Sequence, residues 1–368
     1  MLKFVLSAFN AVVSKQKLII FNSFPDFNDN AKAVYDYIIE NRKDICDSYK
    51  IVWAVDKMPE DMGGVTCPVF VKKSLKGFWY FLRAKYIICT HNYFYDVKAA
   101  NGQLQYNLWH GCGYKCLPRE KPVYRGSYTL ATSDFYAAIQ ASEMDMELDQ
   151  ILVTGLPRND RLLKKQCDVL EKLNIRKEDY ERVLLWLPTY RSSNDCENGV
   201  DFNSIINDLD VAYTLKNANT LLLVKPHPME KLKELSVSND FNIKFLTNDN
   251  LRQLDIDLYD LLKEIDVLLS DYSSVAVDFL LLEKPMTFIC SDMIEYQKIR
   301  GFVFKNVVDY LPGPIIKNKK EFIEYINNIE SVNEEWESVR LELKNLFHKY
   351  HDGNATSRVV DLIFGAHE

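Results

Sequence analysis

Residues 267–282 read Val-Leu-Leu-Ser-Asp-Tyr-Ser-Ser-Val-Ala-Val-Asp-Phe-Leu-Leu-Leu, and this stretch decides the fold. Its opening run, Val267 to Ser270, has the length and the apolar content of a buried strand. A polar turn, Asp271 to Ser274, follows it, and a segment of helical length comes next. Continuous apolar strands are typical of a parallel sheet covered on both faces. The stretch therefore predicts one strand–turn–helix unit of an α/β fold.

The same rhythm recurs along the chain. Helical stretches such as 31–41, 74–84 and 159–173 lie between strands, and the polar segment 174–181 separates two halves. We expect strands at 18–22, 51–55, 86–90, 104–109, 129–132, 151–154, 183–187, 221–225, 243–246, 267–270 and 286–289. This alternation predicts two Rossmann-like domains with a cleft between them.

Composition narrows the class of protein. The chain has 368 residues, with 52 Asp and Glu against 45 Lys and Arg, which gives a net charge of −7. That balance argues against nucleic-acid binding by bulk charge. No run approaches the roughly 18 apolar residues of a spanning helix, and no cleavage site follows residues 1–13. Eight cysteines, with only Cys112 and Cys116 closely spaced, predict reduced thiols and no metal site.

Polar residues follow five of the expected strands, where ligands bind in open α/β sheets. The five groups begin with His110-Gly111-Cys112-Gly113, and continue with Arg158-Asn159-Asp160, Thr189 and Arg191, Lys225 and His227, and Asp271 to Ser274. We expect them to converge on one cleft. The sequence alone also allows simpler roles: Ser273 and Ser274 as helix N-caps, His227 as a rigid turn residue between prolines, and Arg158 with Asp160 as a surface ion pair.

Six motifs resemble one family in order and spacing. They are Trp109-His110-Gly111, Gly155-Leu156-Pro157-Arg158-Asn159-Asp160, Leu187-Pro188-Thr189-Tyr190-Arg191, Lys225-Pro226-His227-Pro228, Asp271-Tyr272-Ser273-Ser274 with Asp278, and Arg300-Gly301-Phe302. Together with segments 22–30 and 352–358, they resemble the CDP-glycerol:poly(glycerophosphate) glycerophosphotransferase family of teichoic acid and capsule synthesis. The resemblance covers nearly the whole chain.

The resemblance implies a GT-B-like fold and transfer of a polyol phosphate from CDP-glycerol or CDP-ribitol to a lipid-linked acceptor, with no cofactor and no metal. It implies His110 as the catalytic base and His227 as a second essential histidine. The implied donor and phosphate ligands are Thr189, Arg191, Lys225, Asp271, Ser273, Ser274, Arg300, Gly301 and Arg358. Gly111, Gly113, Arg158, Asn159 and Asp160 are implied on the acceptor side or as structural residues of the cleft.

The implied domains are an acceptor-side domain at 1–173, a CDP-donor domain at 174–345 and a helical segment at 346–368. Polymerising members commonly read His-Gly-Thr-Pro where this chain has His110-Gly111-Cys112-Gly113, and this difference bears on the acceptor. The choice of polyol, the number of units added, the acceptor, the oligomeric state and metal dependence stay open.

The proposed chemistry agrees with the residue types. An attacking hydroxyl needs a proton acceptor, and a histidine with an ordinary pKa near 6.5 serves at neutral pH. Lysine, arginine and helix N–H groups stabilise phosphoryl charge. We interpret the acidic pairs Asp208/Asp210 and Asp255/Asp257 as solvated surface, not Mg²⁺ ligands. Two alternatives stay open: a nucleotide-sugar glycosyltransferase or epimerase on the same fold, and a non-catalytic membrane-associated assembly protein.

A last expectation concerns the membrane. Basic residues of segment 72–85 (Lys72, Lys73, Lys76, Arg83 and Lys85) interleave with Leu75, Phe78, Trp79, Tyr80, Phe81 and Leu82. This mixture is typical of an interfacial helix, and an ordinary amphipathic crossover helix has the same pattern. The opening segment 2–13 is the second candidate. We expect a cytoplasmic protein, peripheral on the inner face of the membrane.

Overall fold

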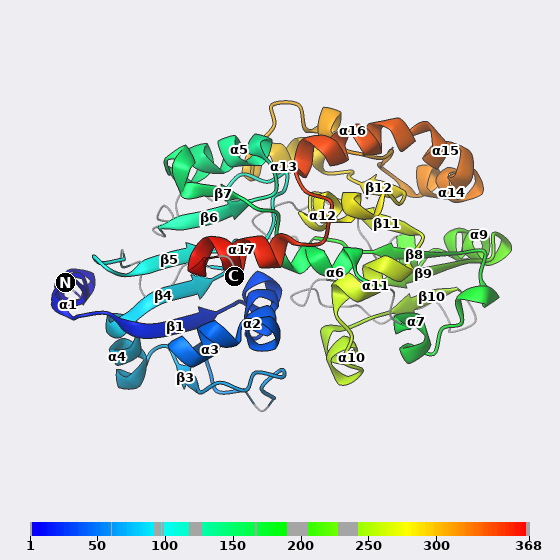
Figure 1. The fold of residues 1–368 in the computed structure, drawn as a ribbon. Helices are drawn as coiled ribbons and strands as arrows, with labels where there is room; N and C mark the ends of the chain where they lie inside the picture. The colour runs from blue at the N-terminus through cyan, green and yellow to red at the C-terminus, as the bar shows by residue number, and fades with distance from the viewer. Residues whose placement is uncertain are drawn as a thin grey trace. The chain divides into compact units, whose positions relative to one another are not determined.

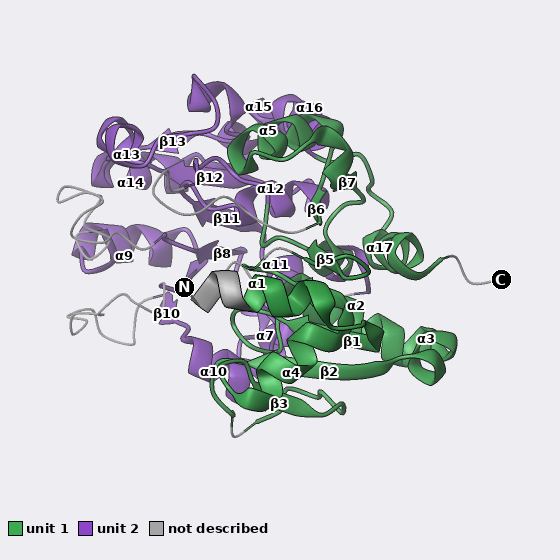
Figure 2. Cartoon of the chain, turned by 90° about the vertical axis from the view of Figure 1, so that its left-hand side faces the viewer, with its two compact units in different colours: residues 1–111, 119–160, 348–368 green, residues 112–118, 161–347 purple. Residues whose placement is uncertain are grey.

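The computed structural model describes residues 2–59, 61–91, 97, 99–117, 127–165, 168–189, 205–226 and 242–365. The chain divides into two compact units, drawn in different colours in Figure 2. The first comprises residues 1–111, 119–160 and 348–368, and the second comprises residues 112–118 and 161–347. The expected boundary at residue 173 lies inside the second unit, and the chain from His348 onwards belongs to the first.

A seven-stranded parallel sheet forms the centre of the first unit, in the order β3-β2-β1-β4-β5-β6-β7. The strands are β1 Gln16–Asn22, β2 Lys50–Val55, β3 Val69–Val71, β4 Ala84–Cys89, β5 Leu104–Asn107, β6 Tyr128–Ala131 and β7 Ile151–Val153. Most of their side chains are buried, as a sheet covered on both faces requires.

The helices of the first unit come from the first 160 residues and from the segment after His348. They are α1 Leu2–Val12, α2 Asp29–Asn41, α3 Lys43–Ser48, α4 Leu75–Arg83, α5 Asp134–Met144 and α17 Ala355–Phe364, with 3₁₀ turns η2 Leu148–Gln150 and η3 Pro157–Asn159. Figure 1 shows α17, in red, beside α2. Val359, Val360 and Ile363 of α17 share one buried cluster with Val34 and Ile38 of α2. The last helix is thus part of the first core.

The second unit contains a six-stranded parallel sheet in the order β10-β9-β8-β11-β12-β13. Its strands are β8 Arg182–Trp186, β9 Thr220–Val224, β10 Ile243–Phe245, β11 Val267–Ser270, β12 Met286–Ile289 and β13 Ile315–Ile316. The helices are α6 Asp160–Leu163, α7 Val169–Lys172, α9 Leu209–Asn217, α10 Asn248–Gln253, α11 Leu258–Glu264, α12 Val275–Phe279, α13 Met293–Ile299, α14 Lys319–Asn327, α15 Ile329–Glu335 and α16 Glu337–Phe347. The 3₁₀ turns are η4 Lys177–Asp179, η5 Leu280–Leu282 and η6 Val307–Tyr310.

The predicted α/β architecture is confirmed, and each expected strand is present with small shifts at its ends. Two strands were not expected, β3 and β13, which have three and two residues. The expected helix at 159–173 was wrong: this segment is divided among η3, α6 and α7. Asp208 and Asp257, from the two acidic pairs, cap α9 and α11 with their side chains. No described helix is long and apolar enough to cross a membrane.

Candidate active site

His110 lies on a tightly held turn after β5. Trp109 has a φ of +59°, an unusual value for a residue with a large side chain, and Gly111 has a φ of +124°. Fully buried Asn30 donates its amide to the carbonyl oxygens of Leu108 (3.1 Å) and Trp109 (2.9 Å). The amide oxygen of Asn107 accepts the N–H of Trp109 at 2.9 Å. These bonds hold a strained backbone in one conformation.

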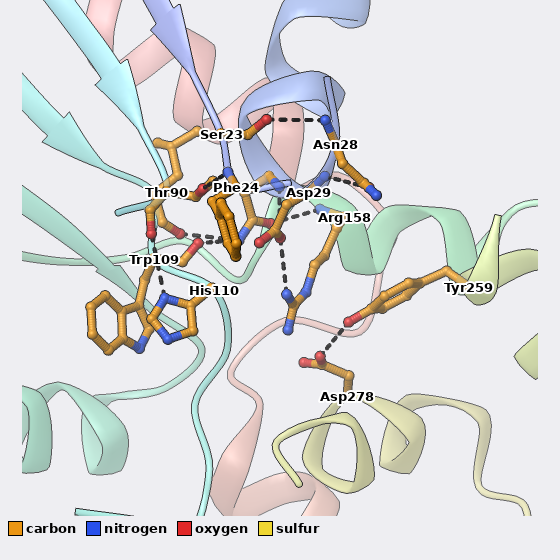
Figure 3. Close-up of polar contacts among 12 residues, drawn as sticks. Ser23, Phe24, Asn28, Asp29, Thr90, Trp109, His110, Arg158, Tyr259 and Asp278 are labelled. Carbon is orange, nitrogen blue, oxygen red and sulfur yellow. Dashed lines mark hydrogen bonds and ion pairs between the residues drawn. The ribbon is translucent and has the colours of Figure 1, made fainter. Parts of the chain in front are cut away.

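The imidazole of His110 is half-buried, and its Nδ1 lies 3.4 Å from the carbonyl oxygen of Thr90 (Figure 3). A carbonyl only accepts, so the proton of a neutral ring in this contact is on Nδ1, and Nε2 carries the lone pair. The ring also contacts Trp109, at 4.1 Å between centroids, and stacks on His91 at 4.4 Å with an interplanar angle of 9°. This arrangement suits a general base acting through Nε2.

His91 is a residue that our sequence analysis missed. It follows Thr90 directly after β4, and its Nδ1 lies 3.0 Å from the hydroxyl of Thr90. The rule that drew attention to His110, a polar residue just beyond a strand, also covers His91. The position of His91 just beyond a strand was therefore the signal in the sequence that could have identified it.

Arg158, Asn159 and Asp160 are buried or nearly so and lie in the first unit. The ion pair between Arg158 and Asp160 that the sequence allowed as a simpler role is not formed: Arg158 pairs with Asp29 at 2.9 Å, as Figure 3 shows. Both oxygens of Asp160 instead accept backbone N–H groups at the start of α17, from Ala355 and Thr356, at 2.8 Å each. These contacts give Asp160 a structural role in the first unit.

Arg358 also belongs to the first unit, whereas the other donor ligands that the sequence implied belong to the second. Its terminal nitrogens pair with both oxygens of Asp352, at 2.7 and 3.0 Å, and its Nε donates to the carbonyl oxygen of Thr154 at 3.0 Å. The guanidinium also stacks on the ring of Tyr350 at 3.9 Å. Arg358 lowers the pKa of Asp352 to about 2.

In the second unit, three expected site residues follow three neighbouring strands, β9, β8 and β11. Thr189, after β8, donates its N–H to Asp271, after β11, at 2.9 Å, and its hydroxyl contacts the other carboxylate oxygen. Asp271 is buried, so its carboxylate joins two strand ends at one edge of the sheet. Lys225 follows β9 at the same edge, because parallel strands end on the same side.

Lys225 differs from Lys284, a second half-buried lysine whose pKa is lowered. Burial lowers the pKa of both ammonium groups. Lys284 donates to the carbonyl oxygens of Lys263 and Ile265, at 2.5 and 2.8 Å. For Lys225, no residue in the described part of the chain forms an ion pair or a side-chain hydrogen bond. A desolvated cation of this kind favours an anion as its partner.

Ser273 and Ser274 precede α12. The hydroxyl of Ser273 accepts the N–H of Val275 at a long 3.5 Å, and Ser274 makes no capping hydrogen bond with its side chain. The simpler role of Ser274 as a helix N-cap is therefore not supported by its hydrogen bonds. Asp278, fully buried within α12, accepts the hydroxyl of Tyr259 at 2.7 Å, as Figure 3 shows. This contact fixes the orientation of α12 against α11.

The segment that follows His110, residues 112–117, belongs to the second unit, and we call it the strap. Lys115 pairs with Phe302 in an antiparallel bridge, and the N–H of Cys116 donates to the carbonyl oxygen of Gly301 at 3.2 Å. A Cβ on Gly113 would lie 3.0 Å from Cβ of Ser274, so glycine permits this close approach. The strap thus contacts both Gly301 and the start of α12.

Three further residues of the predicted site are Arg300, Arg191 and His227. Arg300 is exposed and ends α13. Arg191 and His227 lie outside the described residues. In the described ranges, no group of three or more His, Cys, Asp or Glu side chains is placed to hold a metal ion.

The family model described as CDP-Glycerol:Poly(glycerophosphate) glycerophosphotransferase matches residues 5–365. The chain belongs to this glycerophosphotransferase family. The resemblance predicted from the six motifs, and with it the transferase class, is therefore confirmed.

Two relatives and one solved structure are similar to this chain. A teichoic acid poly(glycerol phosphate) polymerase of Bacillus spizizenii is 25% identical over 95% of this chain and 92% of its own length. A teichoic acid ribitol-phosphate primase of the same species is 26% identical over 95% and 91%. The wall teichoic acid polymerase TagF superimposes with a TM-score of 0.79 at 22% identity, over 98% of this chain and 92% of that chain. The last comparison confirms the GT-B-like fold.

Proposed function

We propose that this glycerophosphotransferase-family chain transfers glycerol phosphate or ribitol phosphate from a CDP-polyol to a hydroxyl of a lipid-linked saccharide or polyol-phosphate acceptor. The acceptor oxygen attacks the phosphorus that carries the polyol and forms a new P–O bond. The bond from that phosphorus to the bridging oxygen breaks, and CMP leaves with the electron pair. The hydroxyl proton goes to Nε2 of His110. The product is a phosphodiester of teichoic acid or capsule synthesis.

The observation that carries this proposal is the environment of Lys225. Its half-buried ammonium, for which the described residues provide no side-chain partner, lies at the edge of the sheet where Thr189 and Asp271 also lie, and two positions before His227 in the sequence. In a nucleotide-dependent transferase, a desolvated cation at that edge stabilises the negative charge that develops on the departing CMP. The family match names the donor that would supply this charge.

The other implied residues keep their proposed roles. We assign the donor and its phosphates to Thr189, Arg191, Lys225, Asp271, Ser273, Ser274, Arg300 and Gly301, and the second essential histidine to His227. Gly111, Gly113, Arg158, Asn159 and Asp160 support the turn of His110 or the acceptor side. Arg358 also stays assigned to the donor, although its pairing with Asp352 supports a structural role equally well.

A direct assay tests the reaction. The purified protein is incubated with CDP-glycerol or CDP-ribitol and a lipid-linked or synthetic saccharide acceptor, and CMP release and product mass are measured. We expect CMP and one or more added polyol phosphates with one of these donors. UDP-sugars serve as the competing donors: turnover of a UDP-sugar, or no CMP from either CDP-polyol, would contradict the proposal.

The base is tested by His110→Ala in the same assay. Loss of a positioned general base should lower kcat by at least about 100-fold while CDP affinity changes little. His351, whose Nε2 contacts the carbonyl oxygen of His348 at 2.9 Å, provides a matched control, since it also lies in the first unit. Unchanged turnover in His110→Ala would remove the assignment.

We also infer that the first unit rests on an anionic membrane surface. Helix α4 buries Phe81 and exposes Leu75 and Trp79, at 90% and 52% of their surface. The guanidinium of Arg83 lies 4.8 Å from the ring of Trp79. Neighbouring α1 exposes Phe9 and Val12. One helix thus satisfies both interpretations of its sequence, with one face in the core and an exposed face that mixes basic and apolar side chains.

Co-sedimentation with anionic liposomes at low and high salt tests this inference. We expect weak binding that falls as salt rises, because each basic side chain near the surface contributes about 1 kcal/mol and is screened within a Debye length. The double variant Leu75→Ala/Trp79→Ala should bind less than the wild type. Leu209→Ala removes an exposed leucine of the second unit and is the control. No association at low salt would contradict the inference.

A further inference from the structure

His91 and His110 follow two neighbouring strands of the first sheet. Strands β4 and β5 are parallel neighbours, with Cys89 opposite Asn107 in the register. The chain beyond β4 therefore runs beside the chain beyond β5, and the N–H of Leu108 donates to the carbonyl oxygen of Cys89. Since His91 and His110 follow these two strand ends, the topology itself brings their rings together. They stack almost in parallel, 4.4 Å apart.

Thr90 connects the two rings. Its carbonyl oxygen faces Nδ1 of His110 at 3.4 Å, and its hydroxyl lies 3.0 Å from Nδ1 of His91. The backbone N–H of Phe24 donates to the same hydroxyl oxygen at 3.3 Å, which leaves the hydroxyl proton available to His91. The ring of Phe24 meets the ring of His91 edge to face at 5.6 Å. His91 is thus held from two directions.

The contact between His110 and the Thr90 carbonyl is long for a hydrogen bond, so it restrains the ring weakly. A flat ring stacked against His110 restrains rotation about the bond between Cβ and the ring. General-base catalysis depends on this orientation, because the accepting lone pair must point at the attacking hydroxyl. A residue that fixes the plane of the base therefore affects the rate without touching the substrate.

We propose that His91 is a positioning residue for His110. Its ring keeps the His110 imidazole in the plane that directs Nδ1 to Thr90 and Nε2 to the acceptor hydroxyl. The inference rests on the proposed function for its catalytic consequence. The orientation itself is independent of which reaction takes place.

Steady-state kinetics with His91→Ala and His91→Phe test the catalytic consequence. Alanine removes the stacking ring and should lower kcat about tenfold, with KM for the CDP-polyol and CDP affinity within about twofold of the wild type. Phenylalanine keeps a flat ring and should retain most of kcat. His351→Ala is the control for loss of a histidine. Wild-type kcat in His91→Ala, or an equal loss in both variants, would overturn the proposal.

An NMR measurement keeps the proposal testable apart from turnover. The chain has six histidines, so ¹⁵N-labelled imidazole signals can be assigned by substitution. We expect the His110 signals of the wild type to report the tautomer with the proton on Nδ1. His91→Ala should shift them towards a mixture of tautomers, and His91→Phe should preserve them. Identical His110 signals in the wild type and His91→Ala would refute the positioning role.

The two experiments fail in different ways. If no CDP-polyol releases CMP while the His110 signals respond to His91→Ala, the proposed function is wrong and the positioning role holds. If CMP is released and neither kcat nor the signals respond, the positioning role is wrong and the function holds. Thermal denaturation of each variant shows whether it is folded. If His91→Ala does not fold, the His110 signals and kcat of His91→Phe are compared with those of the wild type.

Discussion

The carboxylate of Asp160 accepts the backbone N–H of Ala355 at 2.8 Å, across 195 positions of the sequence. Its second oxygen accepts the N–H of Thr356, also at 2.8 Å. Asp160 therefore caps α17 from a distant segment, and it does so while 6% exposed. The bond ties the last helix to the turn that follows β7, and so it fixes the helix on the first core.

Replacing Asp160 by alanine should destabilise the protein. The change leaves two buried N–H groups without their acceptor, which costs about 2 kcal/mol or more of unfolding free energy. Asp160→Asn keeps one acceptor oxygen and should cost less. Denaturation by urea measures both, with Asp249→Ala on α10 as the control for loss of an aspartate. Equal midpoints for all three variants would show that the cap is energetically unimportant.

Gly113→Ala should weaken CDP binding. The new Cβ would lie 3.0 Å from Cβ and 3.2 Å from Cα of Ser274, so either the strap or the start of α12 must move. We expect the dissociation constant of CDP to rise at least about fivefold, because overpacking typically costs about 1–3 kcal/mol and about 1.4 kcal/mol is a factor of ten. Calorimetry measures it. Gly64→Ala, where a Cβ meets nothing but φ is +71°, controls for backbone strain alone; a similar loss of affinity in that variant would contradict the explanation.

Lys225→Met should raise the dissociation constant of CDP about tenfold or more, since it removes a desolvated cation and keeps the length of the side chain. Lys284→Met is the matched control, because Lys284 is also half-buried but donates to two backbone carbonyl oxygens. That variant should lose stability and keep its affinity for CDP. If Lys225→Met binds CDP as the wild type does, Lys225 does not contact the donor.

Asp352 should contribute to the acid sensitivity of the fold. Its bond with Arg358 lowers its pKa in the folded state to about 2, below the ordinary value of about 3.9. The ionised form therefore stabilises the fold above about pH 4, and this contribution falls as the pH drops from about 4 to about 2. The difference in Tm between the wild type and Asp352→Asn should shrink over that interval. A difference that stays constant with pH would mean that ionisation of Asp352 is not involved.

The sequence predicted the strands well because their signal is local. Buried runs such as 221–225 and 267–270 contain apolar residues without alternation, and turns of polar residues end them. Strands β3 and β13 lacked this signal, since two or three residues show no period. The family's motifs then identified the transferase class, which local patterns alone left open.

Partners distant in the sequence were harder to predict. The sequence allowed Arg158 to pair with Asp160, two positions away, but it pairs with Asp29, which the fold brings from 129 positions away. His91 was missed although it follows a strand, because its importance comes from the neighbouring strand that places His110 beside it. Such relationships depend on the order of strands in the sheet, which periodicity does not determine.

The place of α17 in the first core has a consequence for protein synthesis. Strand β7 ends at Val153 and α17 begins at Ala355, so roughly 200 residues are translated between them. At about 5–20 residues per second, the ribosome delivers the covering helix on the order of 10 to 40 seconds after the last strand of its sheet. During that interval the nascent chain exposes the apolar surface that Val359, Val360 and Ile363 later bury. This exposed apolar surface is the kind of surface that a ribosome-associated chaperone binds.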